Sequence, residues 1–272
     1  MFIDNINPVL FTVGPFSVRY YGIVYVLGFL LGYFFLRYNI RNKRLKLTYD
    51  QLDNYFLWLI LGSILMARLF DVFIYSWPSY ANNFSEIYQI WNGGLAFQGG
   101  LIGAVIVTLI FCKRYKIDFY DIADLLVIPT AFTLIFGKIA NYTNSELYGK
   151  ITNPQSTPWC VIFKRNPDAG NYCRHPVQIY ESIANFFMFA ALLTTYSYYE
   201  KFRKKYKKGT IFWLFVLLYS VLRFFITFYR DEPIYSVFGI GLNVGQWVCL
   251  ATIAIACVFL WILLRRIKPK NI

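Results

Sequence analysis

Long apolar runs alternate with short polar segments along the whole chain. A helix that crosses a membrane needs about 20 mostly apolar residues. The pattern therefore predicts seven membrane-spanning helices, at about 18–36, 52–75, 95–112, 121–143, 177–199, 210–229 and 244–264. Because no long linker or convincing repeat separates these runs, we expect one integral-membrane domain over 1–272, with a longer polar loop at about 144–175. The first run is too long for the apolar core of a cleavable signal peptide, and no basic segment precedes it. We therefore expect this run to be a membrane span and not a cleavable signal peptide.

The composition points to the same class of protein. Hydrophobic residues make up 58% of the chain, aromatic residues 21% and charged residues only 15%. Soluble domains average roughly 45–50% apolar and about 25% charged residues. We therefore expect an all-α polytopic membrane protein rather than a soluble one.

The basic residues fall into alternate loops, and this predicts an orientation. Cytoplasmic loops of membrane proteins carry an excess of Lys and Arg. Eighteen of the 27 lysines and arginines follow the first, third, fifth and seventh runs: Arg37, Arg41, Lys43, Arg44, Lys46, Lys113, Arg114, Lys116, Lys201, Arg203, Lys204, Lys205, Lys207, Lys208, Arg265, Arg266, Lys268 and Lys270. We expect the N-terminus outside, the C-terminus in the cytoplasm, and the loop at 144–175 outside the plasma (inner) membrane.

The net charge of +13 follows from this loop pattern. A basic chain can indicate nucleic-acid binding, but here the charge lies beside membrane spans, where it attracts anionic lipid head groups. We expect membrane lipids as partners and no nucleic acid. Cys160 and Cys173 share the outer loop, where a disulfide between them is a hypothesis. One histidine and scattered cysteines give no metal-ligand spacing, so we expect no metal.

The most informative polar segment is 137–149, Gly-Lys-Ile-Ala-Asn-Tyr-Thr-Asn-Ser-Glu-Leu-Tyr-Gly, at the end of the fourth run. Polar groups in hydrocarbon cost about 2–4 kcal/mol each, so they face a protein interior or a ligand. Lys138, Asn141, Asn144 and Glu146 are therefore candidates for the site.

Arginines in the middle of spans are further candidates. Arg68 lies three residues before Asp71, so the two can pair on one helix face as a structural ion pair. The alternative is that Arg68 offers its planar guanidinium to a phosphate. Arg223 lies midway in the sixth run, and we expect it to pair with a glutamate or bind an anion in the interior.

Three other segments carry polar residues at span ends. Tyr21 belongs either to an interfacial aromatic belt or to an interior site. Gln98 stands among glycines that indicate close helix packing or a broken helix. In the segment 174–181, Pro176 suits a first helical turn, and Gln178 and Glu181 share one face of that helix. His175 is either a capping residue or functional, and Glu181 either a structural partner of an arginine or functional.

Together these residues predict interior cations near the outer half of the bundle. Arg68, Lys138 and Arg223 are set against Asp71, Glu146 and Glu181. Such cations suit a phosphate ester. Proton or ion transport can use the same charges, so composition alone does not decide between them.

These motifs together resemble the bacterial prolipoprotein diacylglyceryl transferase family over essentially the whole chain. The family signature Gly-Arg-x-(Gly or Ala)-Asn-Phe-x-Asn-x-Glu-x-x-Gly corresponds to 137–149, with Asn141, Asn144, Glu146 and Gly149 in place. The other family motifs follow in the family's order, at Tyr21-Gly22, Arg68, 174–181, Arg223 and Gly245-Gln246.

Four positions depart from the family pattern. Gln98 stands where the family has a histidine, Lys138 where the signature has an arginine, Tyr142 where it has a phenylalanine, and Thr227 where a glutamate is expected four residues after Arg223. Glutamine cannot act as a general base, and lysine keeps the charge but loses the bidentate fork.

The resemblance implies a transferase that needs no cofactor. Phosphatidylglycerol enters from the outer leaflet, and the lipobox cysteine of a prolipoprotein signal peptide attacks the glycerol carbon that bears the phosphate. A thioether forms and glycerol 1-phosphate leaves. The implied phosphate ligands are Lys138 and Arg223, supported by Arg68.

The remaining roles are also implied by the resemblance. Asn141 and Glu146 orient the head group, Gly149 allows close approach, Tyr21 hydrogen-bonds the substrate and Gln98 takes the histidine's place. Asn144, His175, Gln178 and Glu181 support the site, and Glu146, Glu181, His175 or water accepts the thiol proton.

Two alternatives stay open. The changes at Gln98, Lys138 and Thr227 favour a non-catalytic or altered-specificity phospholipid-binding relative. A small membrane transporter would also use buried charges, but it needs a polar path to the basic side, and the last three spans show little sign of one.

Overall fold

The computed structural model describes residues 1–14, 16–201, 207–237 and 239–265. The predicted fold class is confirmed: within these ranges, seven helical segments are long and apolar enough to cross a membrane. They are Tyr20–Arg41, Tyr49–Tyr75, Phe97–Tyr115, Phe119–Thr143, Val177–Tyr198, Thr210–Thr227 and Val244–Arg265. Six of the basic residues used to predict the orientation lie outside the described residues: Arg203, Lys204, Lys205, Arg266, Lys268 and Lys270.

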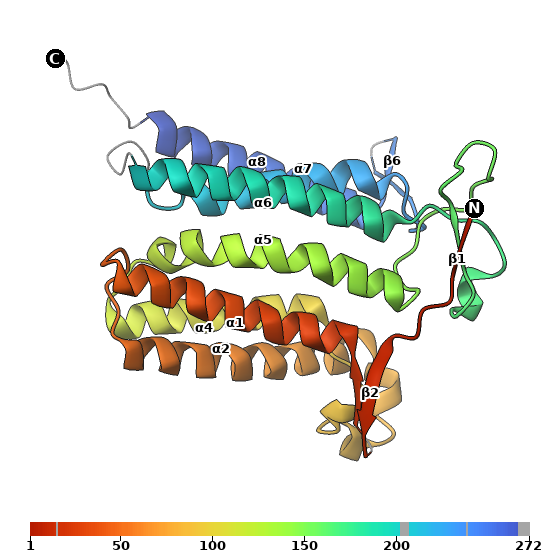
Figure 1. Ribbon diagram of the computed structural model, residues 1–272, viewed down its shortest axis with the longest axis horizontal. Coiled ribbons are helices and arrows are strands. Elements are labelled where there is room, and N and C mark those ends of the chain that lie inside the picture. Colours follow the sequence, from red (N-terminus) through yellow and green to blue (C-terminus); the bar gives the residue numbers. More distant parts are fainter. Residues whose placement is uncertain (15, 202–206, 238, 266–272) are drawn as a thin grey trace. The chain divides into compact units, whose positions relative to one another are not determined.

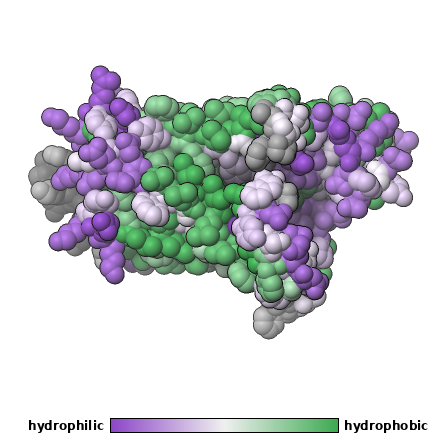
Figure 2. Space-filling model, turned by 90° about the horizontal axis from the view of Figure 1, so that it is seen from below, coloured by the Kyte–Doolittle hydropathy of each residue, from purple (hydrophilic) through white to green (hydrophobic). Residues whose placement is uncertain are grey.

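The chain forms two compact units, 1–28 with 124–272 and 29–123. Two helices belong to both, because α1 (Tyr20–Arg41) and α5 (Phe119–Thr143) each pass from one unit into the other. Hydrophobic side chains cover the helices, and hydrophilic ones gather at the helix ends (Figure 2). This distribution is what a helix needs when its middle lies in hydrocarbon.

The unit 29–123 is built on the pair α2 (Tyr49–Phe70) and α4 (Phe97–Tyr115), which pack along their length (Figure 1). A side chain at Gly103 would approach the carbonyl oxygen of Gly62 to 2.5 Å, so only glycine permits this spacing. The glycines of this segment thus serve tight helix packing. Short helices join the pair: η1 (Asp71–Tyr75, a π-helix), α3 (Trp77–Tyr80), η2 (Phe84–Glu86) and η3 (Ile90–Asn92).

The unit 1–28 with 124–272 contains most of α5 and three further long helices, α6 (Val177–Lys201), α7 (Thr210–Thr227) and α8 (Val244–Arg265). Helix α7 packs against both α6 and α8 (Figure 1). Ser182 and Asn185 of α6 donate to the carbonyls of Ile135 and Leu134 on α5. Buried hydroxyl and amide groups thus join α6 to α5, since such groups need partners where water is absent.

Short strands lie before α1 and in the segments that connect the helices of this unit. Strand β1 (Phe2–Asp4) pairs in parallel with β4 (Val161–Phe163), with Ile3 opposite Ile162. Two hairpins complete the set, β2 (Val9–Val13) with β3 (Phe16–Arg19) and β5 (Tyr235–Val237) with β6 (Ile240–Leu242). The short helix η4 (Pro167–Ala169) follows β4. Cys160 and Cys173 form a disulfide across 13 residues of this region, as the sequence suggested.

Candidate functional site

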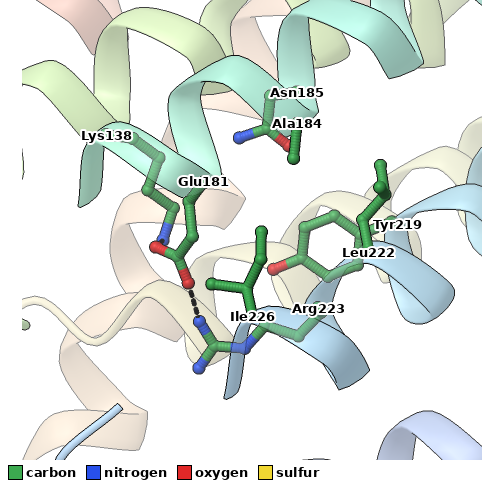
Figure 3. A pocket seen from close by; sticks show the side chains of 8 residues that line it. All are labelled: Lys138, Glu181, Ala184, Asn185, Tyr219, Leu222, Arg223 and Ile226. Carbon is green, nitrogen blue, oxygen red and sulfur yellow. Dashed lines mark hydrogen bonds and ion pairs between the residues drawn. The ribbon is translucent and has the colours of Figure 1, made fainter. Parts of the chain in front are cut away.

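A buried carboxylate on α6 pairs with three basic side chains of its unit. Glu181 is 4% exposed. Its Oε2 lies 2.8 Å from Nζ of Lys138 on α5, and its Oε1 accepts hydrogen bonds from Arg223 on α7 and, at 3.1 Å, from Nη1 of Arg230 just beyond α7. Figure 3 shows Lys138 and Arg223 converging on Glu181 from opposite sides. Lys138 and Arg223, predicted to share a pocket, thus contact the same carboxylate.

A second carboxylate completes this cluster. Oε1 of Glu232 accepts a 2.5 Å hydrogen bond from Nε of Arg230 and a 3.4 Å hydrogen bond from Nη2 of Arg223. Unlike Glu181, Glu232 is only partly buried. We define Lys138, Arg223, Arg230, Glu181 and Glu232 as the charged cluster; its formal net charge is +1.

The charged cluster opens into a narrow recess between the helices. Its polar wall carries Lys138, Glu181, Asn185, Tyr219 and Arg223, and its apolar wall is made of Ala184, Leu222 and Ile226 (Figure 3). Electrostatic attraction is stronger in such a poorly hydrated space than in water. Negative charge is therefore favoured at the polar wall of the recess, beside an apolar surface.

A second polar group lies at the end of α5 and in the turn that follows it. Oε1 of Glu146 accepts hydrogen bonds from Nδ2 of Asn141 at 2.5 Å and of Asn144 at 3.3 Å. The turn that brings them together has Ser145 and Leu147 at φ of 53° and 58°. Backbone in this left-handed region is strained for residues other than glycine and is held by its surroundings.

Two contacts hold that turn. The fully buried Gln178 of α6 donates from Nε2 to the carbonyl oxygen of Glu146 at 2.6 Å. On the other side, Oγ of Ser145 donates to Oδ2 of Asp4, on β1, at 2.5 Å. Gln178 thus has a structural partner, as does Glu181 three residues later.

Gly149 lies where three segments meet. Its N–H donates to the carbonyl oxygen of His175 at 2.9 Å. A side chain here would approach Cγ2 of Val177 to 2.5 Å and the carbonyl oxygen of Tyr229 to 2.6 Å. Gly149 is therefore required by the packing of the protein's own backbone.

His175 and Tyr21 are both close to other aromatic side chains. Nδ1 of His175 lies 3.2 Å from the hydroxyl of Tyr180, and partial burial lowers the pKa of His175 below its usual value, so the ring is neutral at pH 7. The hydroxyl of Tyr21 lies 2.6 Å from that of Tyr25. The role of Tyr21 at the site stays a prediction.

Arg68 and Gln98 belong to the other unit. Arg68 is 5% exposed and donates to the carbonyl oxygens of Glu86, Ile87, Gly93 and Gly94, at 2.5 to 2.9 Å. Its distance to Asp71 is 4.0 Å, so the ion pair is loose. Arg68 organises the loop before α4, and a contact with phosphate stays a prediction. Gln98 is exposed in the first turn of α4.

Sequence reasoning did not assign Arg230 and Glu232 to the site. Arg230 directly follows the sixth apolar run, and Glu232 lies two residues further on, where charged loop residues are common. The available signal was the charged triplet Arg230-Asp231-Glu232, directly after a span that already contains Arg223. Seven residues, close to two helical turns, separate Arg223 from Arg230, so a helix that continued past the end of α7 at Thr227 would bring both arginines to one face.

The fold and the charged cluster define a multi-pass α-helical membrane protein with an ion-paired interior. The protein-family model that describes prolipoprotein diacylglyceryl transferase matches residues 8–262. The chain belongs to that family.

Individual relatives agree with this assignment. A protein of Sinorhizobium medicae named phosphatidylglycerol–prolipoprotein diacylglyceryl transferase is 34% identical over 270 residues, covering 96% of this chain and 92% of the relative. Relatives with the same name from Nitratidesulfovibrio vulgaris and Rickettsia bellii are each 35% identical, over 95% and 90% of this chain and 94% and 91% of their own lengths. The family resemblance seen in the sequence is confirmed.

Proposed function

We propose that this protein transfers the diacylglyceryl group of phosphatidylglycerol to the lipobox cysteine of prolipoproteins. The cysteine sulfur forms a bond to the glycerol carbon that bears the phosphate, and the bond from that carbon to the phosphate oxygen breaks. Glycerol 1-phosphate leaves with the electron pair, and the thiol proton passes to a basic group or to water. Family membership supports this reaction.

The observation that carries the proposal is the convergence of Lys138 and Arg223 on one recess. The leaving group gains negative charge as its bond breaks, and fixed cations in a poorly hydrated site stabilise that charge. Glu181 holds these cations in place. We assign the lipid phosphate to Lys138 and Arg223 and add Arg230.

The group at the end of α5 orients the rest of the head group. Asn141 and Asn144 each have an amide that can bind a glycerol hydroxyl, and Glu146 can accept from one. The hydroxyl of Tyr21 forms a further hydrogen bond with the substrate. The thiol proton goes to Glu146, to the neutral ring of His175 or to water, because the oxygens of Glu181 are occupied by cations.

The topology proposed with this function places the chemistry at the outer face of the plasma (inner) membrane. Basic residues gather after α1, after α4 and at the ends of α6 and α8, which favours the cytoplasm for that side. The loop at 144–175 then faces outward, where phosphatidylglycerol of the outer leaflet and the signal peptide of a prolipoprotein meet.

The test uses membranes supplied with phosphatidylglycerol and a prolipoprotein. We expect Arg223→Ala and Asn141→Ala each to abolish thioether formation, read as the mass of the modified peptide. Arg114→Ala, an exposed arginine at the end of α4, is the matched control and should keep full activity. Unchanged lipidation by both site variants would refute the assignment.

The second candidate is a phospholipid-binding relative without catalysis. The absence of a histidine at Gln98 and of an acid at Thr227 favours it, as does the lysine at position 138. Complementation of a strain depleted of its own transferase separates the two. Growth with lipidated lipoproteins supports the transferase, whereas phosphatidylglycerol binding without growth supports the binding protein.

A further inference from the structure

Glu232 is more exposed to solvent than Glu181, the other carboxylate of the charged cluster. Glu181 is buried among three cations, whereas Glu232 is partly exposed and contacts Arg223 and Arg230 from the loop between α7 and β5. Its longer contact, 3.4 Å to Arg223, joins it to the guanidinium that lines the recess. Glu232 is therefore the more exposed of the cluster's two negative charges, and it contacts a guanidinium that lines the recess.

The position of Glu232 is fixed by its neighbours. Asp231 accepts a 2.7 Å hydrogen bond from Nη1 of Arg174, and Arg174 is itself held by the carbonyl oxygens of Gly149 and Ala169. The other oxygen of Glu232 lies beside Gly245, in the first turn of α8. The positive end of that helix stabilises a carboxylate there.

Glu232 sets the net charge that an incoming anion meets. With Glu232 the charged cluster carries a net +1, and without it the cluster would carry +2. The proposed substrate is a phosphodiester with one negative charge. The proposed product is a phosphate monoester with about −1.5 to −2 charges at pH 7.

We propose that Glu232 is a specificity-determining residue that matches the site to the monoanionic phosphodiester and weakens its hold on the dianionic phosphate monoester. This inference rests on the proposed function, in which the recess holds the phosphate. The repulsion from Glu232 scales with the charge of the ligand. A dianion therefore loses twice as much binding free energy as a monoanion, and the released product leaves the site more readily.

The experiment compares two soluble probes on the full-length protein in detergent. Glycerol 1-phosphate carries the dianion, and glycerophosphoglycerol, which is phosphatidylglycerol without its acyl chains, carries the monoanion. We expect Glu232→Gln to tighten binding of the monoanion about threefold and of the dianion about tenfold, measured by calorimetry at pH 7.5. The second factor should equal the square of the first.

Activity gives an independent readout. In Glu232→Gln, inhibition of thioether formation by added glycerol 1-phosphate should strengthen about tenfold, while KM for phosphatidylglycerol changes about threefold or less. Asp168→Asn is the matched control, because it also removes one negative charge from the same unit but from an exposed site in η4. Asp168→Asn should change neither the inhibition by glycerol 1-phosphate nor the KM for phosphatidylglycerol.

Several results would overturn the inference. Equal factors for the two probes, no change, or weaker binding of both would show that Glu232 only positions the arginines. If neither probe bound to the wild-type protein or to Glu232→Gln, the assignment of the recess as the phosphate-binding site would be wrong. A failure of the proposed function is distinct, because the wild-type protein would then form no thioether whatever the two binding ratios are.

Discussion

At the scale of single residues, the interior charges are tolerable because each one is paired with an opposite charge. A lone arginine at the centre of a bilayer costs about 2.5–3.5 kcal/mol or more. Here Lys138, Arg223 and Arg230 surround Glu181. Removing the carboxylate of Glu181 would leave uncompensated buried cations, which costs about 3–5 kcal/mol. Variants of these residues therefore need a stability measurement beside the activity assay.

Gly149 gives a prediction about packing. In Gly149→Ala the new methyl group would lie 2.6 Å from the carbonyl oxygen of Tyr229, which cannot yield as a flexible side chain could. We expect a loss of about 1–3 kcal/mol in stability, measured by thermal unfolding in detergent. Gly137→Ala is the control, because a side chain at Gly137 meets nothing within 4 Å. It should be neutral or slightly stabilising; equal losses in both variants would contradict the packing argument.

Gln98 gives a prediction about chemistry. Its side chain is exposed in the first turn of α4, so a histidine fits there without repacking. We expect Gln98→His to keep or raise the rate of thioether formation, because histidine can take a proton and glutamine cannot. Gln98→Ala serves as the comparison. A collapse of activity in Gln98→His would mean that the pocket has been rebuilt for different chemistry.

At the scale of elements, helix ends carry much of the local order. Asp124 of α5 accepts hydrogen bonds from the backbone N–H groups of Gly209 and Phe212, at 2.6 and 2.7 Å, and so caps the first turn of α7. Asn243 and Gln246 cap α8 by exchanging backbone and side-chain bonds. Gln246, which matched a family motif, thus has a structural role as a cap.

The cap at α7 can be tested directly. Asp124→Ala leaves two backbone donors of α7 without their acceptor, so we expect a loss of about 1–2 kcal/mol in stability. Asp50→Ala, which removes an exposed carboxylate from the first turn of α2, should cost about 0.5 kcal/mol or less. Thermal unfolding of both variants decides the matter, and equal effects would refute a specific role for Asp124.

The sequence predicts the long helices well and their connections poorly. Each span is a local apolar run, so its existence can be read from neighbouring residues. The pairing of β1 with β4 joins residues near positions 3 and 162, and no local sequence pattern predicts a contact between segments so far apart.

The site was predictable to a similar degree. Lys138, Glu181 and Arg223 are conspicuous because they interrupt apolar runs. Arg230 and Glu232 lie among ordinary loop charges, and only the folded chain brings them to Glu181 and Arg223. The bonds of Arg68 to backbone carbonyls escaped prediction for the same reason, since those carbonyls lie 18 to 26 residues away.

At the scale of the whole molecule, cysteine labelling can test both the disulfide and the orientation, in two separate experiments. In denaturant without reductant, we expect maleimide to label three of the five cysteines, and all five after reduction. Closing a loop of this size contributes about 3 kcal/mol. Labelling of all five before reduction would contradict the bond between Cys160 and Cys173.

The orientation needs single cysteines placed on the two sides. In a variant without the three free cysteines, Ser156→Cys lies in the loop at 144–175 and Lys116→Cys lies at the end of α4. We expect an impermeant maleimide added to intact spheroplasts to label the first and spare the second. The reverse pattern would invert the proposed topology.

The bond between Glu181 and Arg223 has a consequence for biogenesis. These residues lie on α6 and α7, which leave the ribosome one after the other. Partitioning of α7 alone from the translocon would carry an unneutralised guanidinium into lipid. We therefore expect the two helices to enter the bilayer as a hairpin, with the carboxylate of Glu181 already bound to Arg223.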